Sequence, residues 1–247
     1  MSFPTTQWNL IAAATLNGDR AGRDALNELC RLYREPVLAF FRSKMARPED
    51  AQDLTQRLFE RLCEGRIWKR ADASKGLFRS YLLAIAFNVL RNWNKAVATS
   101  KRGPGTALLS LDFLDENGWE PAAPDDDTAI TFDREWALAA LAAAWDRMEE
   151  SAAARPEKSA RFAILRRFLP GKDPPPTYEA AADSLGVSVD HLKTLIHRIR
   201  SKFRKYLRVE VARTVSSPDE LESEMDHLHS VMIAGIGGGA NRDADIL

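Results

Sequence analysis

The chain has 247 residues, 45% of them hydrophobic, and its 35 basic side chains balance 35 acidic ones to a formal net charge of zero. This length can bury one large core or two smaller ones, and typical domain sizes favour two. No apolar run approaches the roughly 20 residues that span a bilayer, and the first ten residues lack the basic and apolar stretches of a signal peptide. We therefore expect a cytoplasmic protein that is not inserted in a membrane. The neutral total argues only weakly against nucleic-acid binding, because binding depends on where the charges lie.

Apolar residues recur at intervals of three and four along almost the whole chain, and this periodicity predicts an all-α protein without strands. Pro48, followed by Glu49 and Asp50, is typical of a helix start, because proline suits the first turn and acids favour the positive end of the helix dipole. The expected helices are at residues 5–16, 22–33, 36–46, 48–64, 76–97, 132–150, 157–168, 177–185, 190–212 and 218–232.

Residues 101–130 interrupt this pattern with glycines, prolines and acids. The glycines and prolines are Gly103, Pro104, Gly105, Pro121 and Pro124, and the acids are Asp112, Asp115, Glu116, Glu120, Asp125, Asp126 and Asp127. This composition predicts an acidic flexible linker between two helical domains, at residues 1–100 and 131–213. Residues 214–247 are expected to form a C-terminal helical extension followed by a disordered tail.

Residues 177–203 have the layout of a helix-turn-helix unit. Thr177 can cap the first helix, and Gly186 permits a sharp turn. Apolar residues of the second helix repeat at helical spacing toward the first, which leaves mostly basic and polar side chains on the other faces. In such a unit the start of the second helix enters the major groove of DNA. The expected base readers are Lys193, Thr194, His197 and Arg198, and the wider set of candidates for duplex contact adds His191, Arg200 and Lys202.

A basic amphipathic helix can also be a solvated face with no partner, and that alternative stays open. His191 and His197 are six residues apart and lie on different faces of a helix, so no metal site is expected there. Cys30 and Cys63 lie far apart in sequence and have no neighbouring His or Cys at metal-binding spacing. They are interpreted as reduced thiols rather than as part of a zinc or disulfide framework.

Basic and aromatic side chains are interleaved in the first domain, in the helix expected at 76–97 and in the loop before it. Aromatic rings beside cations suit unstacked bases, because every base offers a π-face. The loop at residues 64–76 is the better place for an extruded base, since a loop can form a pocket that a packed helix face cannot. Helix aromatics such as Tyr81 and Phe87 can instead belong to the core. The candidates for contact with single-stranded DNA are Arg66, Trp68, Lys69, Lys75, Asn88, Arg91, Asn92 and Lys95.

Three segments taken together resemble a known protein family. They are "PEDAQDLTQRLFERL", "FRSYLLAIAFNVLRNW" and, much later, "YEAAADSLGVSVDHLKTLIHRIRSKFRKYL". They resemble regions 2 and 4 of the extracytoplasmic-function, or group 4, sigma factors of bacterial RNA polymerase, and the resemblance covers residues 5–232. The segments "TTQWNLI", "DLTQ", "FDREWAL" and "VARTVSSPDELE" further resemble a branch of that family abundant in planctomycete-like bacteria.

The resemblance implies a sigma factor that binds core RNA polymerase and directs promoter recognition, minus-10 melting and transcription initiation. It implies that the loop from Arg66 to Lys75, together with Asn88, holds a flipped minus-10 base, and that the second helix of the helix-turn-helix reads the minus-35 element. The acidic linker would run toward the polymerase cleft and RNA exit path. The residues implied to contact the polymerase are Asp53, Gln56, Phe59 and Glu60. The expected partners are core polymerase and promoter DNA, with an anti-sigma factor or a Ser/Thr kinase as regulator, and no cofactor.

Arg57 departs from the family pattern, which commonly has an acid after the glutamine. This departure weakens the charge complementarity expected with the polymerase. One hypothesis is that phosphorylation of the neighbouring Thr55 adds about two negative charges and restores that complementarity, which would make a kinase the activator. The alternative is that Thr55 is an ordinary helix residue.

No nucleophile with a base partner, phosphate-binding glycine loop or carboxylate cluster stands out in the sequence, so no enzyme and no catalytic residue are expected. Two other classes remain as alternatives to a sigma factor. One is a stand-alone helix-turn-helix transcriptional regulator, and the other is a helical interaction protein with no role on DNA. A repressor would normally be a symmetric dimer, and the sequence has no long coiled-coil seam.

Overall fold

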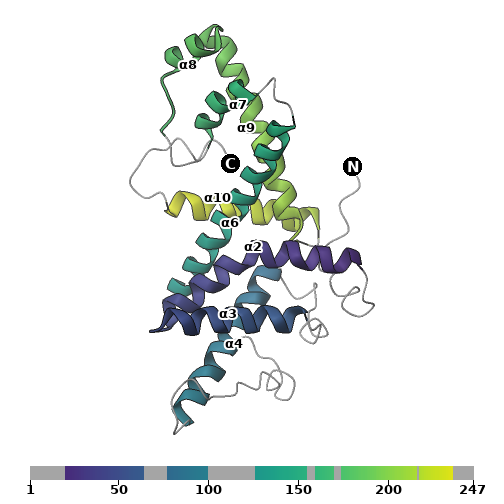
Figure 1. Cartoon of the computed structure of the whole chain (residues 1–247), viewed down its shortest axis with the longest axis vertical. Coiled ribbons are helices and arrows are strands. Elements are labelled where there is room, and N and C mark those ends of the chain that lie inside the picture. The colour runs from purple at the N-terminus through teal and green to yellow at the C-terminus, as the bar shows by residue number, and fades with distance from the viewer. Residues whose placement is uncertain are drawn as a thin grey trace. The chain divides into compact units, whose positions relative to one another are not determined.

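The computed structural model in Figure 1 describes residues 20–63, 77–99, 126–154, 159–169, 174–215 and 217–235. Within these ranges every regular element is a helix, so the predicted all-α class is confirmed. None of the described helices is long and apolar enough to cross a membrane. The expected helix at 5–16, the loop at 64–76, the first part of the expected linker and the expected tail lie outside the described residues.

The chain divides into two compact units. Unit 1 takes residues 1–139 and 212–221, and unit 2 takes residues 140–211 and 222–247. The predicted division placed residue 131 onward in the second domain, whereas residues 131–139 pack in unit 1. The next paragraphs give the contacts that hold them there.

Unit 1 is built on α2 (Arg20–Lys44), α3 (Pro48–Cys63) and α4 (Phe78–Thr99). Three residues join α2 to α3, so the two helices form an antiparallel hairpin, and α4 packs against both (Figure 1). The side chains at the centre of the core are fully buried. They are Tyr33, Phe40 and Phe41 of α2, Leu54, Leu58 and Leu62 of α3, and Phe78 and Leu82 of α4.

Pro36 lies inside α2, where the sequence predicts two helices, at 22–33 and 36–46. The prediction of a break was wrong, because α2 is one continuous helix of 25 residues. Pro36 has no N–H to donate to the preceding turn, which costs stability in a helix interior. Pro36 is buried with Tyr33 and Val37, so the packing of this face against the rest of unit 1 offsets that loss.

The helix α6 (Asp126–Ala153) begins six residues before the predicted start at 132. Residues 126–130, assigned to the linker from composition, are therefore helical. The ring of Phe132 stacks on Tyr33 of α2, with centroids 6.5 Å apart and an interplanar angle of 23°. Arg79 of α4 is hydrogen-bonded to Asp133, and its guanidinium lies 5.3 Å from the ring centroid of Trp136. These contacts place the first part of α6 in the core of unit 1.

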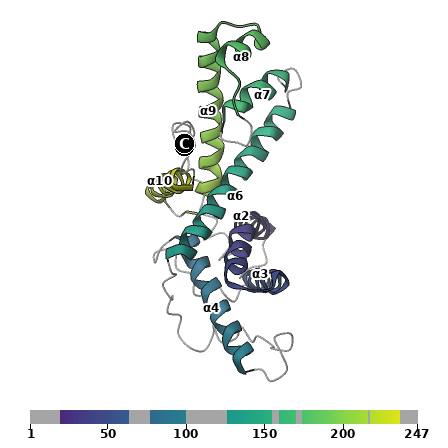
Figure 2. The same cartoon turned by 90° about the vertical axis from the view of Figure 1, so that its left-hand side faces the viewer.

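Unit 2 contains the remainder of α6, α7 (Ser159–Leu165), the short helix η5 (Arg166–Phe168), α8 (Tyr178–Leu185) and most of α9 (Val189–Ala212). In this unit α6 and α9 lie side by side (Figure 2), with the rings of Trp145 and Phe203 5.3 Å apart. Arg147 of α6 is hydrogen-bonded to Glu210 of α9, whose side chain is buried. This pair joins the two helices by charge.

The last helix, α10 (Pro218–Gly235), matches the extension predicted at 218–232. The Ser217 hydroxyl accepts a hydrogen bond from the Glu220 N–H at 3.2 Å, so Ser217 caps the helix. In unit 2 the Arg208 guanidinium of α9 donates two hydrogen bonds to the Glu222 carboxylate, one of them at 2.9 Å. This hydrogen bonding lowers the pKa of Glu222 below its usual value, and it fixes α10 to the C-terminal half of α9.

The turn between α8 and α9 depends on Gly186, which has φ 63° and ψ 36° in the left-handed region. Its N–H bonds to the carbonyl of Asp183 at 3.1 Å, and the N–H of Val187 bonds to the carbonyl of Ala182 at 3.0 Å. These bonds provide donors for backbone carbonyls at the end of α8 that have no partner within the helix. The predicted role of Gly186 as the residue that permits the turn is confirmed.

Replacing Gly186 with alanine should lower the free energy of unfolding by about 1 kcal/mol. A Cβ built at this position meets nothing within 4 Å, so the cost is the left-handed backbone alone and not a clash. Urea unfolding followed by far-UV circular dichroism measures it. Ser184→Ala, at an exposed position of α8 with ordinary helical geometry, is the matched control and should change stability little. Equal stability of Gly186→Ala and wild type would contradict the strain argument.

Candidate nucleic-acid interface

The two helices α8 and α9 are each capped by a side chain at their start. The Thr177 hydroxyl accepts a hydrogen bond from the Ala180 N–H, and the Ser188 hydroxyl accepts one from the His191 N–H, each at 3.2 Å. The caps fix where each helix begins, and Gly186 fixes the turn between them. The buried face of the pair consists of Ala181, Ala182, Leu192, Leu195, Ile196 and Ile199.

The opposite edge of α9 is exposed over its first two and a half turns. Five of the seven residues predicted to contact duplex DNA lie on it in exposed positions: His191, Lys193, Thr194, His197 and Arg198. The apolar face is buried, so the exposed edge of α9 has a defined orientation. This edge, which we term the α9 polar edge, presents two cations, two imidazoles and a hydroxyl.

Asp190 organises the start of the α9 polar edge. Its carboxylate accepts a hydrogen bond from the Lys193 ammonium at 3.3 Å, and its backbone carbonyl accepts one from the Thr194 hydroxyl at 3.2 Å. Both side chains of the Asp190–Lys193 pair are mostly exposed, so the pair contributes little to stability. A phosphate or a base acceptor can therefore compete for the Lys193 ammonium at small cost. The sequence analysis did not single out Asp190 or Ser188, although the capping pattern of Ser188 three residues before His191 could have indicated the latter.

Arg200 and Lys202, the other two predicted duplex contacts, differ from these five. Arg200 is half-buried and donates a hydrogen bond to the backbone carbonyl of Phe168 at 3.3 Å. The Lys202 ammonium donates to the Ser151 hydroxyl of α6 at 2.9 Å and lies 5.5 Å from the ring centroid of Tyr206. Arg200 is thus engaged within unit 2, whereas Lys202 is exposed but held toward α6, so we do not count either in the α9 polar edge.

In unit 1, the helix α4 carries four of the residues predicted to contact single-stranded DNA. Asn88 is only 2% exposed, and this burial conflicts with its predicted contact with a base. Asn88 lies on the buried side of α4. Helical periodicity alone did not distinguish it from the exposed residues of the same helix. Arg91 and Lys95 are exposed and Asn92 is half-buried. The predicted loop residues Arg66, Trp68, Lys69 and Lys75 lie outside the described residues.

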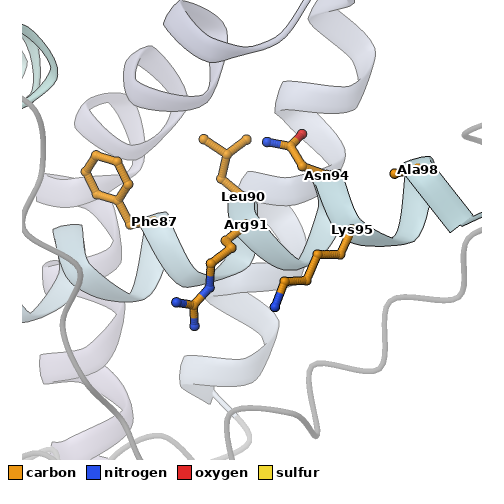
Figure 3. Close-up of a pocket in the computed structure, with 6 residues that line it drawn as sticks. All are labelled: Phe87, Leu90, Arg91, Asn94, Lys95 and Ala98. Atoms are coloured by element: carbon orange, nitrogen blue, oxygen red, sulfur yellow. The ribbon is translucent and has the colours of Figure 1, made fainter.

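Arg91 and Lys95 border an open groove of about 470 Å³ on α4. The groove is also lined by Phe87, Leu90, Asn94 and Ala98, so its lining is mostly apolar. Figure 3 shows Arg91 and Lys95 extending to the same side of the helix, one turn apart. An apolar surface beside two cations suits a group that is flat and hydrophobic on one side and anionic on the other, as an unstacked nucleotide is.

The helix α3 carries the residues predicted to contact the polymerase. Asp53, Gln56 and Glu60 are exposed, and Phe59 is half-buried. The polar side chains are paired along the helix. Arg57 donates a hydrogen bond to Asp53 at 3.2 Å, and the Gln56 amide donates one to Glu60 at 2.9 Å. Arg57 thus neutralises the charge of Asp53. We term the surface formed by Asp53, Gln56, Phe59 and Glu60 the α3 acidic row.

Thr55 is buried, with 2% of its surface exposed, and its hydroxyl donates to the carbonyl of Ala51 at 2.8 Å. A kinase cannot reach a hydroxyl in this position, and a phosphate there would be placed among apolar core residues. The hypothesis of phosphorylation at Thr55 conflicts with this burial. Thr55 lies on the same stripe as Ala51, Leu58 and Leu62, so the helical spacing already placed it on the core face.

A comparison of the chain with protein-family models, with curated proteins and with solved structures finds no match.

Proposed function

We propose that the protein is a sigma factor of the extracytoplasmic-function type, which binds bacterial core RNA polymerase and directs it to promoters. The observation that carries the proposal is the α9 polar edge, held by a capped helix-turn-helix whose other face is buried. Lys193, Thr194, His197 and Arg198 are exposed on this edge and are side chains of the kind that donate hydrogen bonds to base edges in the major groove.

The second support is that unit 1 offers two further surfaces of different chemistry. The groove beside Arg91 and Lys95 suits an unstacked base and its phosphate, as melting of the minus-10 element would produce. The α3 acidic row suits a basic partner surface, the role that the family resemblance gives to the polymerase. A repressor needs only the first of the three surfaces. A sigma factor uses all three, because it must read duplex, hold melted strand and bind the polymerase.

The mechanism follows from this division of tasks. Unit 2 positions the polar edge in the major groove of the minus-35 element, where base contacts set the register. Unit 1 binds the polymerase through α3 and stabilises the melted minus-10 strand by stacking and by charge, so that opening the duplex costs less. The residues act by binding alone, and no bond to DNA is made or broken by the protein.

Purified full-length protein should make bacterial core polymerase start transcription at a small set of discrete sites on a genomic DNA library. Core polymerase alone is the first control, and the protein without polymerase on the same DNA is the second. Start sites that need both proteins are the expected result, mapped by sequencing the transcript ends. Tight sequence-specific binding of duplex by the protein alone, without new start sites, would instead identify a stand-alone regulator. No binding to either DNA or polymerase would leave an interaction protein.

A further inference from the structure

Two cysteines that are 33 residues apart in the sequence meet in unit 1. Cys30 lies on α2, fourteen residues before the helix ends at Lys44, and Cys63 lies on α3, fifteen residues after it begins at Pro48. In an antiparallel hairpin, equal distances from the connection bring residues level, because each residue advances both helices by about 1.5 Å. Cys63 is close enough to Cys30 to raise its pKa, by charge and by a hydrogen bond between the two side chains.

The two thiols differ in their surroundings. Cys63, the last residue of α3, is exposed, whereas Cys30 is half-buried. Cys30 follows Leu26 and precedes Tyr33 on one stripe of α2, and both of these neighbours are buried. Burial, followed by the proximity of Cys63, raises the pKa of Cys30 to about 12. Cys30 is therefore a thiol at neutral pH, and a water-borne oxidant meets Cys63 first.

We propose that Cys30 and Cys63 form a reversible oxidation site, which hydrogen peroxide or another small peroxide converts to a disulfide between α2 and α3. A disulfide requires sulfurs about 2.05 Å apart on side chains that approach from neighbouring backbones. A pair already in hydrogen-bond contact needs only a small movement to reach this. The sequence analysis interprets both cysteines as reduced thiols, and in this proposal that is one of two states of the pair.

The reaction balances in two steps. The Cys63 thiolate attacks one peroxide oxygen, an S–O bond forms, the O–O bond breaks, and the second oxygen leaves as water after taking the proton that the thiol released. The Cys30 sulfur then attacks the sulfur of the Cys63 sulfenic acid. The S–O bond breaks, the S–S bond forms, and the hydroxyl leaves as water with the Cys30 proton. The two sulfurs supply two electrons, and the peroxide accepts both.

The bond would close a loop that runs through the helical connection and back. Cross-linking two points of a chain lowers the entropy of the unfolded state, and more so for longer loops. The oxidised protein should therefore melt about 5–10 °C above the reduced protein. A disulfide in a cytoplasmic setting is transient and reports the redox state of the cell, which fits a site with one exposed and one shielded sulfur.

The test treats the reduced full-length chain with hydrogen peroxide, blocks remaining thiols under denaturing conditions, and analyses it by mass spectrometry. We expect a monomer with a cross-linked peptide pair containing Cys30 and Cys63, reversed by dithiothreitol, and the higher melting temperature. The matched variants are Cys30→Ser, in which Cys63 should stop at sulfenic acid or over-oxidise, and Cys63→Ser, in which Cys30 should react far more slowly.

Three results would overturn the proposal, and all of them can be obtained with the wild-type protein. The first is over-oxidation of Cys63 while Cys30 stays a free thiol. The second is cross-linking between two chains instead of within one. The third is an oxidised protein that melts below the reduced one, because the bond would then need a backbone different from the native one. None of these measurements depends on DNA or polymerase, so the outcome is independent of the function proposed above.

Discussion

Replacing Lys193 and Arg198 together with alanine should weaken binding of the protein to its promoter duplex at least about 30-fold. Each good contact to a base edge is worth about 1–3 kcal/mol, and both side chains stand exposed on the α9 polar edge. Among the described residues Lys193 is paired with Asp190, and the pair is exposed, so removal of Lys193 should not unfold the helix. Binding to a promoter recovered from the transcription experiment, measured against random duplex across a range of salt concentrations, gives the effect.

The matched control removes two exposed cations from unit 1 by substituting Arg34 and Arg47 with alanine. It changes the net charge of the chain by the same amount and should leave promoter affinity nearly unchanged. If Lys193 and Arg198 read bases, their loss reduces affinity for the promoter more than for random duplex. Equal losses on both duplexes would reduce these residues to phosphate contacts, and no loss on either would remove the polar edge from the interface.

Replacing Trp136 with alanine should lower the free energy of unfolding by about 3–5 kcal/mol. The indole is fully buried, and the Arg79 guanidinium lies 5.3 Å from its ring centroid. The substitution leaves a large cavity and also removes the ring that covers the half-buried Arg79–Asp133 pair. Urea unfolding followed by circular dichroism measures the loss without relying on tryptophan fluorescence.

Leu138→Ala is the control for this prediction, because Leu138 lies two residues further along the same helix and is 43% exposed. Its cost should stay near 0.5 kcal/mol, about the usual size for a surface substitution. A small cost for Trp136→Ala, similar to that of Leu138→Ala, would mean that the first part of α6 does not belong to the core of unit 1.

The positions of the helices could be predicted from the sequence wherever apolar periodicity and local end signals agree. The turn at Gly186 and the caps at Thr177 and Ser217 are local, so neighbouring residues determine them. The two errors in helix bounds have one cause. Pro36 looks like a break and Asp126 looks like linker when their neighbours alone are considered. Pro36 is buried in unit 1, and Asp126 begins a helix that contacts distant residues of unit 1 from Phe132 onward.

In the candidate site, too, local patterns could be predicted from the sequence and contacts between distant residues could not. Six of the seven residues predicted on α9 are exposed, because the apolar stripe of that helix is clear enough to assign the remaining faces. Asn88 and Thr55 were chosen for their chemistry, and both are buried. The contact of Cys30 with Cys63 depends on α2 folding back onto α3 as a hairpin, and their spacing becomes informative only once the bounds of both helices are known.

Both ends of the acidic segment at residues 100–125 are anchored in the same unit. The preceding helix α4 belongs to unit 1, and the first part of α6 packs there against α4, through Arg79 with Asp133, and against α2, through Tyr33 with Phe132. The chain therefore first enters unit 2 in the middle of a helix, near Ala139 and Ala140, and not through the segment whose composition suggests a tether. A single proteolytic cut within the acidic segment would consequently leave two fragments that stay associated as a non-covalent pair.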